Sequence, residues 1–309
     1  MGLVGKVGII GLGAMGSGMF SQLQKLAGPV GVFDVSSQAM ERAQGQGGLP
    51  AASAAALAAQ SDYLVISIPG RAMETLFYGI EGILRAVKAG AVVIDTSSTG
   101  PRLTERLAKD LRERGVHLLD APVSGGPGGA AAGKLALMVG GDADAYARAE
   151  PLLRALGTPV YVGPSGAGQL TKLINNMIVG VQFAAVAEAF ALAARLGLDA
   201  GRVFEAIKGG AAQSWVLDVG GAAMLRRDFS PGGTIDLHVR DLANALDVAR
   251  EAGCSVPVTA VTHELYVAAA AAGLGGEAQQ ALVKLWERHL GIQIVDGTHI
   301  NGDLGRGNR

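Results

Sequence analysis

Short apolar runs alternate with longer stretches of helical periodicity along the first half of the chain, which is the pattern of parallel strands joined by crossover helices. Strands are predicted near residues 6–10, 30–33, 63–68, 91–95, 117–120, 135–139 and 160–162. Helices are predicted near residues 15–26, 38–44, 52–60, 71–77, 101–114 and 144–156. The first half is therefore expected to be an α/β domain.

From Gln169 onward the strand signal ends, and helical periodicity runs to residue 195 and then through five further segments to residue 290. The turn at 163–168 marks the boundary between the two halves. The predicted organisation is an α/β domain over residues 1–164, a long interdomain helix over 165–195 and an all-α domain over 196–296. Residues 297–309 are polar and glycine-rich and are expected to fray.

The most apolar stretch, residues 173–187, lies in the middle of the chain. It is shorter than the roughly 18 to 20 apolar residues that a bilayer span needs, and it contains Asn175, Asn176 and Gln182. No membrane partner is therefore expected. Because a helix that is apolar on more than one face is buried against other protein, we expect it to lie between domains or between subunits, in a homodimer or homotetramer.

Charge and cysteine content argue against several classes of protein. The 26 basic and 27 acidic side chains among 309 residues give a net charge of −1, so no basic surface for a nucleic acid is expected. Cys254 is the single cysteine, which excludes an intrachain disulfide and a thiolate metal cluster, and no metal is expected. The start of the chain resembles no secretion signal, so a cytoplasmic protein is expected. Cys254 itself is expected to be a small buried side chain.

Gly11, Gly13 and Gly16 form the pattern G-x-G-x-x-G directly after the first predicted strand and at the start of the first predicted helix. In this context the three glycines allow, in order, a tight turn, a close approach of backbone to a pyrophosphate, and packing of helix against strand. The alternative is a glycine-rich turn that holds no ligand. We expect a dinucleotide on the segment made of Gly11, Leu12, Gly13, Ala14, Met15 and Gly16.

Asp34 ends the second predicted strand, about 20 residues beyond the glycines, where a carboxylate can accept hydrogen bonds from the hydroxyls of an adenine ribose. A 2′-phosphate there would meet a negative charge, and the nearest downstream basic residue, Arg42, lies about two helical turns further on. NAD is therefore favoured over NADP. The alternative role for Asp34 is to cap the next helix, which Ser36 or Ser37 would do equally well.

A glycine-rich segment, D-A-P-V-S-G-G-P-G-G-A-A-A-G, runs from Asp120 to Gly133. It is too rich in glycine for a strand and too long for a hairpin turn, so a binding loop is expected. Ser124 and the N–H groups of Gly125 and Gly126 could form a concave set of donors for a carboxylate, because glycine permits positive φ. The alternative is a flexible linker between two strands.

Lys172 is the only charged residue between Arg154 and Glu188, and it lies in the first turn of the long apolar helix. Burial of an ammonium group is costly, so such a lysine either reaches solvent or is placed for proton transfer. Asn176 is four residues further on, on the same helix face, where its amide could hold a substrate hydroxyl. A structural lysine and a catalytic lysine are both compatible with this spacing.

Three segments together resemble the motifs of the β-hydroxyacid dehydrogenases. They are G-L-G-A-M-G at residues 11–16, the glycine-rich segment at 120–133, and G-A-G-Q-L-T-K-L-I-N-N at 166–176. The resemblance covers nearly the whole chain, and the family includes 3-hydroxyisobutyrate dehydrogenase, tartronate semialdehyde reductase and L-threonate dehydrogenase. It implies a Rossmann-type domain, a long connecting helix and a helical domain.

The resemblance also implies roles for individual residues. Lys172 would be the general acid/base, Asn176 would position the substrate, and Ser124, Gly125 and Gly126 would hold its carboxylate. Ile68 and Pro69 match a pair that borders the cofactor, and Ser98 matches a residue near the nicotinamide.

This chain departs from the family pattern at two positions that face the expected pocket. Arg240 stands where the family usually has the lysine of a Lys-Asp-Leu sequence, and it would contact substrate or cofactor through a planar fork that cannot lose its proton. Gly233 replaces a common phenylalanine. The stretch at Ser214 and Trp215 resembles that of the sugar-acid members, and a tryptophan packed in a helical core is the alternative.

These features predict an NAD-dependent oxidoreductase that interconverts a small β-hydroxy acid, of 3-hydroxyisobutyrate, glycerate or sugar-acid type, and its semialdehyde or keto form. The expected ligands are NAD and a small carboxylate. Two alternatives remain open. One is a reductase of imines or of sulfo-sugar semialdehydes on the same scaffold, and the other is a dinucleotide-binding interaction module without catalysis.

Overall fold

The computed structural model describes residues 5–297. The chain folds into two compact units, which divide between Lys172 and Leu173. The division falls inside one long helix, α8 (Ala167–Arg195), which corresponds to the helix predicted over residues 165–195. The part of the predicted tail beyond residue 297 lies outside the described residues.

The first unit is built on a nine-stranded sheet. Six parallel strands lie in the order β3-β2-β1-β4-β5-β6, the order of a doubly wound dinucleotide-binding sheet. Their bounds are β1 (Val7–Ile10), β2 (Gly31–Phe33), β3 (Leu49–Pro50), β4 (Tyr63–Ile66), β5 (Val92–Asp95) and β6 (His117–Asp120). β8 (Leu135–Gly141) is antiparallel to β6, and it also pairs with β7 (Val123–Ser124) and β9 (Gly157–Gly163). β1, β4 and β5 are buried along their whole length, as strands covered on both faces must be.

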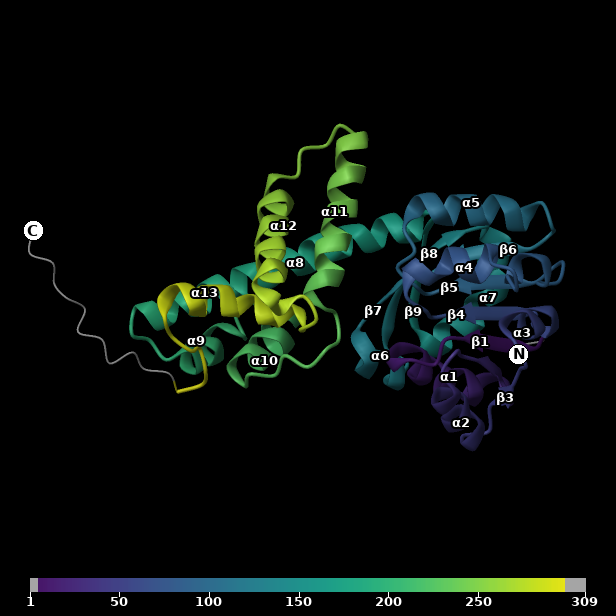
Figure 1. The fold of residues 1–309 in the computed structure, drawn as a ribbon, viewed down its shortest axis with the longest axis horizontal. Coiled ribbons are helices and arrows are strands. Elements are labelled where there is room, and N and C mark those ends of the chain that lie inside the picture. Colours follow the sequence, from purple (N-terminus) through teal and green to yellow (C-terminus); the bar gives the residue numbers. More distant parts are fainter. Residues whose placement is uncertain (1–4, 298–309) are drawn as a thin grey trace, which may run out of the picture. The chain divides into compact units, whose positions relative to one another are not determined.

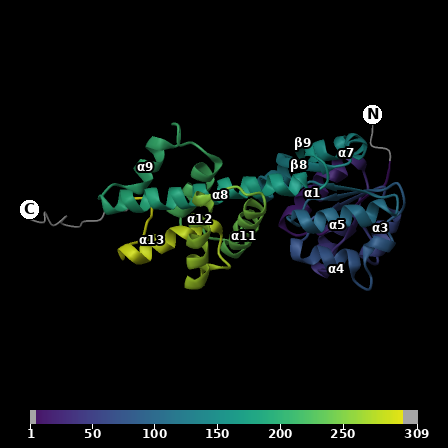
Figure 2. The same ribbon diagram turned by 90° about the horizontal axis from the view of Figure 1, so that it is seen from above.

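Helices cover both faces of this sheet, as Figure 1 shows for the elements labelled α1 to α7 and Figure 2 for α1, α3, α4, α5 and α7. One buried apolar cluster joins the sheet to α1 (Ala14–Ala27), α2 (Ser37–Gly45), α6 (Gly126–Ala132) and α7 (Ala143–Leu156). A second cluster on the other face joins it to α3 (Ala54–Gln60), α4 (Met73–Tyr78), α5 (Pro101–Arg112) and the short 3-10 turn η2 (Ile83–Arg85). Another 3-10 turn, η1 (Gly70–Ala72), precedes α4. The predicted α/β half is confirmed.

The glycine-rich segment 120–133 is not a loop throughout, which corrects the sequence-based expectation. Val123 and Ser124 form the short strand β7, and residues from Gly126 to Ala132 form the helix α6. Pro127 lies in the first turn of α6, where a missing N–H costs nothing, and alanines complete the helix. Gly133 ends it in the left-handed conformation.

In the second unit, all regular structure of the described residues is helical. After α8 come α9 (Ala200–Ile207), a π-helical turn η3 (Val216–Gly221), α10 (Ala222–Leu225), α11 (Ile235–Glu251), α12 (Pro257–Ala269), a π-helical turn η4 (Ala270–Leu274), a 3-10 turn η5 (Gln279–Leu282) and α13 (Val283–Leu290). Two buried clusters pack α8 against α9, η3, α10 and α13, and against α11 and α12. α11 and α12 lie side by side (Figure 1). The predicted all-α second half is confirmed.

Two expectations from the sequence are wrong: that the apolar stretch is too short to span a bilayer, and that Cys254 is buried. α8 has 29 residues and an 18-residue window of mean hydropathy 1.9, so it is long and apolar enough to cross a membrane, although 44% of that window is buried inside the protein. One such helix is weak evidence for a span, and the absence of a membrane partner stays a prediction. Cys254 is exposed rather than buried, because it lies in the turn after Gly253, between α11 and α12.

Candidate active site

The glycine turn after β1 has the geometry of an anion cradle. Gly11 has φ of +95°, and a Cβ there would lie 2.2 Å from the carbonyl oxygen of Ser67. A Cβ on Gly16 would lie 1.9 Å from the carbonyl oxygen of Gly11, so both positions require glycine. A Cβ on Gly13 would meet no atom within 4 Å, and Gly13 begins α1 without any side chain capping the helix. The open space and the uncapped N–H groups fit a pyrophosphate.

Asp34 joins the end of β2 to this cradle. Its Oδ2 accepts a hydrogen bond of 2.6 Å from the N–H of Leu12, and its Oδ1 accepts one of 2.8 Å from the N–H of Ser36. Ser36, rather than Asp34, caps α2 by accepting from the N–H of Ala39. Each carboxylate oxygen keeps a lone pair for a ribose hydroxyl.

The cradle segment offers mainly backbone to a ligand. The Leu12 side chain is buried, Ala14 is exposed and Met15 is half-buried. The sequence predicted all three as cofactor-binding, and Leu12 can take part only through its main chain.

Ile68, Pro69 and Ser98 follow the neighbouring strands β4 and β5, at the same edge of the sheet as the cradle. The two segments are in contact, because a Cβ on Gly70 would lie 2.0 Å from the carbonyl oxygen of Ser98. The hydroxyls of Thr96 and Thr99 and that of Ser97 bond inside the protein, whereas the Ser98 hydroxyl makes no hydrogen bond to the described residues. Ser98 is therefore the hydroxyl of this loop that is available to a ligand.

Gly125 and Gly126 have φ of +130° and +65°, the positive values that the sequence predicted. Both lie at the start of α6, whose first turn has no side-chain cap. Ser124 precedes them, half-buried, at the end of β7. A Cβ on Gly126 would meet no atom within 4 Å, so its backbone is open to a small ligand such as a carboxylate.

The first turn of α8 is fixed to the ends of β5 and β6. Asp120 accepts hydrogen bonds from the N–H groups of Gly166 (2.9 Å) and Gln169 (3.0 Å), and burial raises the pKa of this carboxyl against the lowering effect of those bonds. The Gln169 side chain donates to the carbonyl oxygen of Ser97 and accepts from the N–H of Gly100. Lys172 follows in the same unit and is half-buried.

Sequence reasoning assigned no role to Asp120 or Gln169. Both belong to the motifs given above. Asp120 could have been found as a single carboxylate at the end of a predicted strand, and Gln169 as a single amide side chain at the start of the long helix, each among apolar residues and glycines.

In the second unit, three polar residues form a connected chain between α8 and α11. The Asn176 amide donates to Oδ2 of Asp241 at 2.8 Å, and Arg240 donates to Oδ1 of Asp241 at 3.2 Å. The Asn176 oxygen accepts from Asn175 at 3.0 Å. Asn176 and Asp241 are buried, whereas the Arg240 side chain is 42% exposed. Asp241 was not predicted as a site residue, and it fixes which side of the Asn176 amide is the donor.

Two other predicted positions of the second unit can be placed. Trp215 is 53% exposed, so the alternative interpretation, a tryptophan packed in a helical core, is wrong. Gly233 is half-buried, and a Cβ there would lie 3.3 Å from the Gln279 amide. A phenylalanine at this position would therefore displace Gln279.

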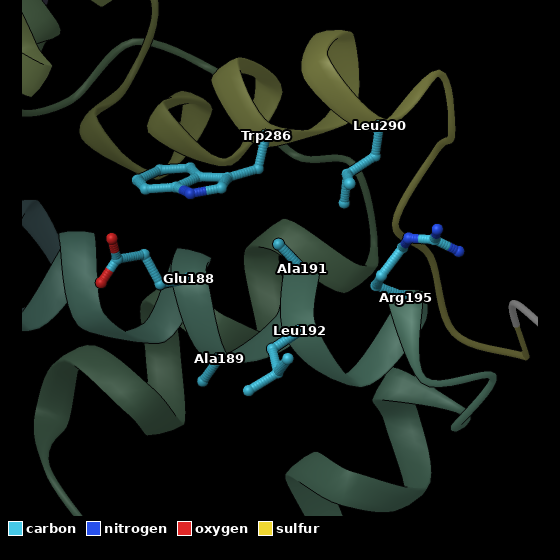
Figure 3. Close-up of a pocket in the computed structure, with 7 residues that line it drawn as sticks. All are labelled: Glu188, Ala189, Ala191, Leu192, Arg195, Trp286 and Leu290. Carbon is cyan, nitrogen blue, oxygen red and sulfur yellow. The ribbon is translucent and has the colours of Figure 1, made fainter. Parts of the chain in front are cut away.

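A hollow of about 380 Å³ lies between α8 and α13. Figure 3 shows Trp286 and Leu290 of α13 directed toward α8, with Glu188 and Arg195 at its two ends. None of the predicted site residues lines it, and Glu188 is about 24 Å along α8 from Lys172 at 1.5 Å per residue. This hollow is separate from the candidate site.

The described residues fit a nicotinamide dinucleotide. Such a cofactor needs a close approach to backbone donors and an acceptor for its ribose. The turn at Gly11 and Gly16, where a Cβ would have no room, and the open backbone at Gly13 provide the first, and the carboxylate of Asp34 provides the second. Within residues 5–297, no three His, Cys, Asp or Glu side chains gather closely enough to hold a metal ion.

Comparison with known proteins gives matches along most of the chain. Residues 6–163 match a family described as the NAD binding domain of 6-phosphogluconate dehydrogenase, and residues 166–286 match one described as NAD-binding of NADP-dependent 3-hydroxyisobutyrate dehydrogenase. The L-threonate dehydrogenase of Cupriavidus necator is 36% identical, over 91% of this chain and 95% of that protein. The 2-hydroxy-3-oxopropionate reductase of Escherichia coli is 37% identical, over 91% and 97%. The crystal structure of a 3-hydroxyisobutyrate dehydrogenase from Salmonella typhimurium has a TM-score of 0.83 at 31% identity, over 91% and 99%.

Proposed function

Because the chain belongs to the β-hydroxyacid dehydrogenase family and is an oxidoreductase of CH–OH groups that binds a nicotinamide dinucleotide, we propose that Lys172 is its general acid/base. The observation that carries the proposal is the placement of Lys172. It is a half-buried cation in the first turn of α8, and that turn is hydrogen-bonded to the ends of β5 and β6 in the sheet that forms the glycine cradle.

The proposed roles follow from what each residue can donate or accept. The bound dinucleotide supplies the hydride chemistry. In the oxidative direction, a neutral Lys172 Nζ takes the proton of the substrate hydroxyl, and in the reductive direction the ammonium returns it. The N–H groups of Gly125 and Gly126, with the Ser124 hydroxyl, hold the substrate carboxylate. The Asn176 amide, oriented by Asp241, holds the reacting oxygen.

NAD is the proposed cofactor, in preference to NADP. Asp34 supports this choice, because its carboxylate lies at the end of β2 and is already fixed by two backbone N–H groups. A 2′-phosphate beside Asp34 would be repelled by the carboxylate. The Arg42 side chain is exposed, and no hydrogen bond to the described residues holds it near Asp34.

The proposed substrate is a small β-hydroxy acid or the corresponding semialdehyde or ketone. The relatives and the solved structure named above carry threonate, 2-hydroxy-3-oxopropionate and 3-hydroxyisobutyrate in their names. The presence of Lys172 and Asn176 supports a hydroxy acid over an imine, because a carbonyl oxygen needs a proton donor beside it during reduction, whereas an iminium nitrogen already carries its proton. The same pair supports catalysis over a dinucleotide-binding interaction module.

A panel of substrates tests the proposal. The purified protein is given L-threonate, D-glycerate, 3-hydroxyisobutyrate, L-serine and a cyclic imine, with NAD(H) and NADP(H) in parallel, and the absorbance of the reduced nicotinamide is followed. We expect turnover of at least one hydroxy acid and a higher kcat/KM with NAD than with NADP. Turnover of the imine alone, or of no compound in either direction, would contradict the proposed reaction.

A further inference from the structure

We propose that Gln169 is a positioning residue, whose side chain locks the first turn of α8 to the loop after β5 and so holds Lys172 and Ser98 in a fixed arrangement. The proposal rests on the role proposed above for Lys172 and on the Ser98 hydroxyl being available to a ligand. Nothing in the comparisons assigns a role to Gln169.

Both polar atoms of the Gln169 side-chain amide form hydrogen bonds with the loop that follows β5. Gln169 Nε2 donates to the carbonyl oxygen of Ser97 at 2.8 Å, and its Oε1 accepts from the N–H of Gly100 at 3.2 Å. The side chain is 2% exposed, so water does not replace these bonds when they are broken. A primary amide is suited to this place because it donates and accepts at one end of a short stem.

The same loop is also held by hydrogen bonds to residues at the ends of β4 and β5. Ser97 donates its N–H to Asp95 at 2.9 Å, and its hydroxyl accepts from the N–H of Ile68 at 3.2 Å. Thr99 donates its hydroxyl to Asp95 at 2.5 Å. The side chain of Ser98 alone in this run makes no hydrogen bond to the described residues. Gln169 therefore completes the hydrogen bonds that hold this loop around the Ser98 hydroxyl, which stays available to a ligand.

The same residue anchors the helix that carries Lys172. The N–H of Gln169 donates to Asp120, and a Cβ on the preceding Gly168 would lie 2.4 Å from the carbonyl oxygens of Asp120 and Met138, so the helix start runs directly against the sheet. Lys172 is three residues on, one helical turn away. The main chain of Gln169 thus ties the start of α8 to the end of β6, and its side chain ties it to the loop after β5.

The test compares Gln169→Leu with Thr171→Val. Among residues 5–297, the Thr171 hydroxyl bonds only within its own helical turn, donating to the Ala167 carbonyl oxygen at 2.8 Å, so its loss does not release the loop. Both variants are expected to lower Tm. Only Gln169→Leu is expected to lower kcat, between about 10- and 100-fold, with the Kd for NADH from calorimetry within about threefold of the wild type. Gln169→Met replaces the leucine variant if that one does not fold.

A second readout does not depend on turnover. The rate at which acetic anhydride modifies Lys172 in the protein without added cofactor is measured by peptide mass spectrometry. We expect a rise of about threefold or more in Gln169→Leu, because the released turn opens more often, and a rate near the wild type in Thr171→Val.

Two results would overturn the positioning role: a kcat of Gln169→Leu equal to that of the wild type, or equal losses of kcat in both variants. If Lys172→Ala keeps full turnover, the proposed function fails instead. If Lys172→Ala is inactive while Gln169→Leu retains both turnover and lysine reactivity, only the present inference fails.

Discussion

Asp95 is a fully buried carboxyl at the end of β5, in the loop that carries Ser98. Burial raises its pKa to about 6, although hydrogen bonds from Thr99 and Ser97 favour the ionised form. Because the folded protein then holds a proton that the unfolded chain releases near pH 4, the contribution of Asp95 to stability falls as the pH rises from about 4 to about 6.

Asp95→Asn is expected to remove this dependence. The asparagine can still accept from Ser97 and can donate to Thr99, whose hydroxyl then acts as an acceptor. Relative to the wild type, the variant should gain up to about 3 kcal/mol in the free energy of unfolding between pH 4 and pH 7. Urea unfolding at several pH values checks this. A difference between the two proteins that is the same at every pH would show that Asp95 does not titrate in that range.

Arg240 is the residue on which substrate choice is expected to depend. Its guanidinium uses two N–H groups on Asp241, at 3.2 and 3.4 Å, and the side chain is 42% exposed. A planar fork recognises an additional hydroxyl or anionic group on the substrate better than an ammonium does. We expect Arg240→Lys to lower kcat/KM for L-threonate relative to 3-hydroxyisobutyrate by about tenfold. Equal ratios in the two proteins would remove Arg240 from substrate selection.

Individual residues were predictable where the backbone itself required them. Gly11 and Gly16 could be identified because a side chain has no room at either position, and this requirement produces the G-x-G-x-x-G spacing in the sequence. The partnership of Asn176 with Asp241 could not be predicted, because 65 residues separate them and only the packing of α8 on α11 brings them together. Gln169 was missed for the same reason, since its partners lie 69 and 72 residues away.

At the scale of elements, α8 carries an exposed apolar stripe in the second unit. Ile174, Ile178 and Leu192 are 58%, 55% and 61% exposed, and their spacing places them on one side of the helix. Large apolar side chains in a row on the surface of a helix are typical of a protein interface. The stripe supports the expectation of a homodimer or homotetramer.

Leu192→Arg is expected to weaken that assembly, because it places a charge in the stripe about 30 Å along α8 from Lys172. Light scattering after size-exclusion chromatography should show a smaller mass than for the wild type. Val261→Arg on α12 is the matched control, since Val261 is 66% exposed and lies outside the stripe. A mass unchanged by Leu192→Arg, or reduced equally by both variants, would contradict an interface on α8.

The elements that sequence predicted well are those with a strong period, and the errors have physical reasons. The buried strands β1, β4 and β5 are continuous apolar runs between turns and were found close to their bounds. α6 was missed because four of its seven residues are glycine or proline, which disfavour a helix. Its position against α1, where Gly18 leaves room for the backbone of Ala131, stabilises a helix that local propensity does not predict.

For the whole molecule, the two units were predictable because the strand signal ends where helical periodicity takes over. The first unit alone contains the cradle, Asp34, Ser98, the start of α6 and Lys172, so it holds the groups proposed for cofactor binding and for proton transfer. The second unit contributes Asn176, Asp241 and Arg240. Cofactor affinity and binding of the substrate carboxylate should therefore depend on the first unit, and selection among hydroxy acids on Arg240 of the second.

The turnover of Lys172→Ala tests the central claim most directly. It is measured with the best hydroxy acid of the panel, beside the Kd for NADH from calorimetry. We predict a kcat lower by about 10² to 10⁴ with a Kd within about threefold of the wild type, because the lysine moves the proton and the cradle binds the dinucleotide. Undiminished turnover in this variant would contradict the account.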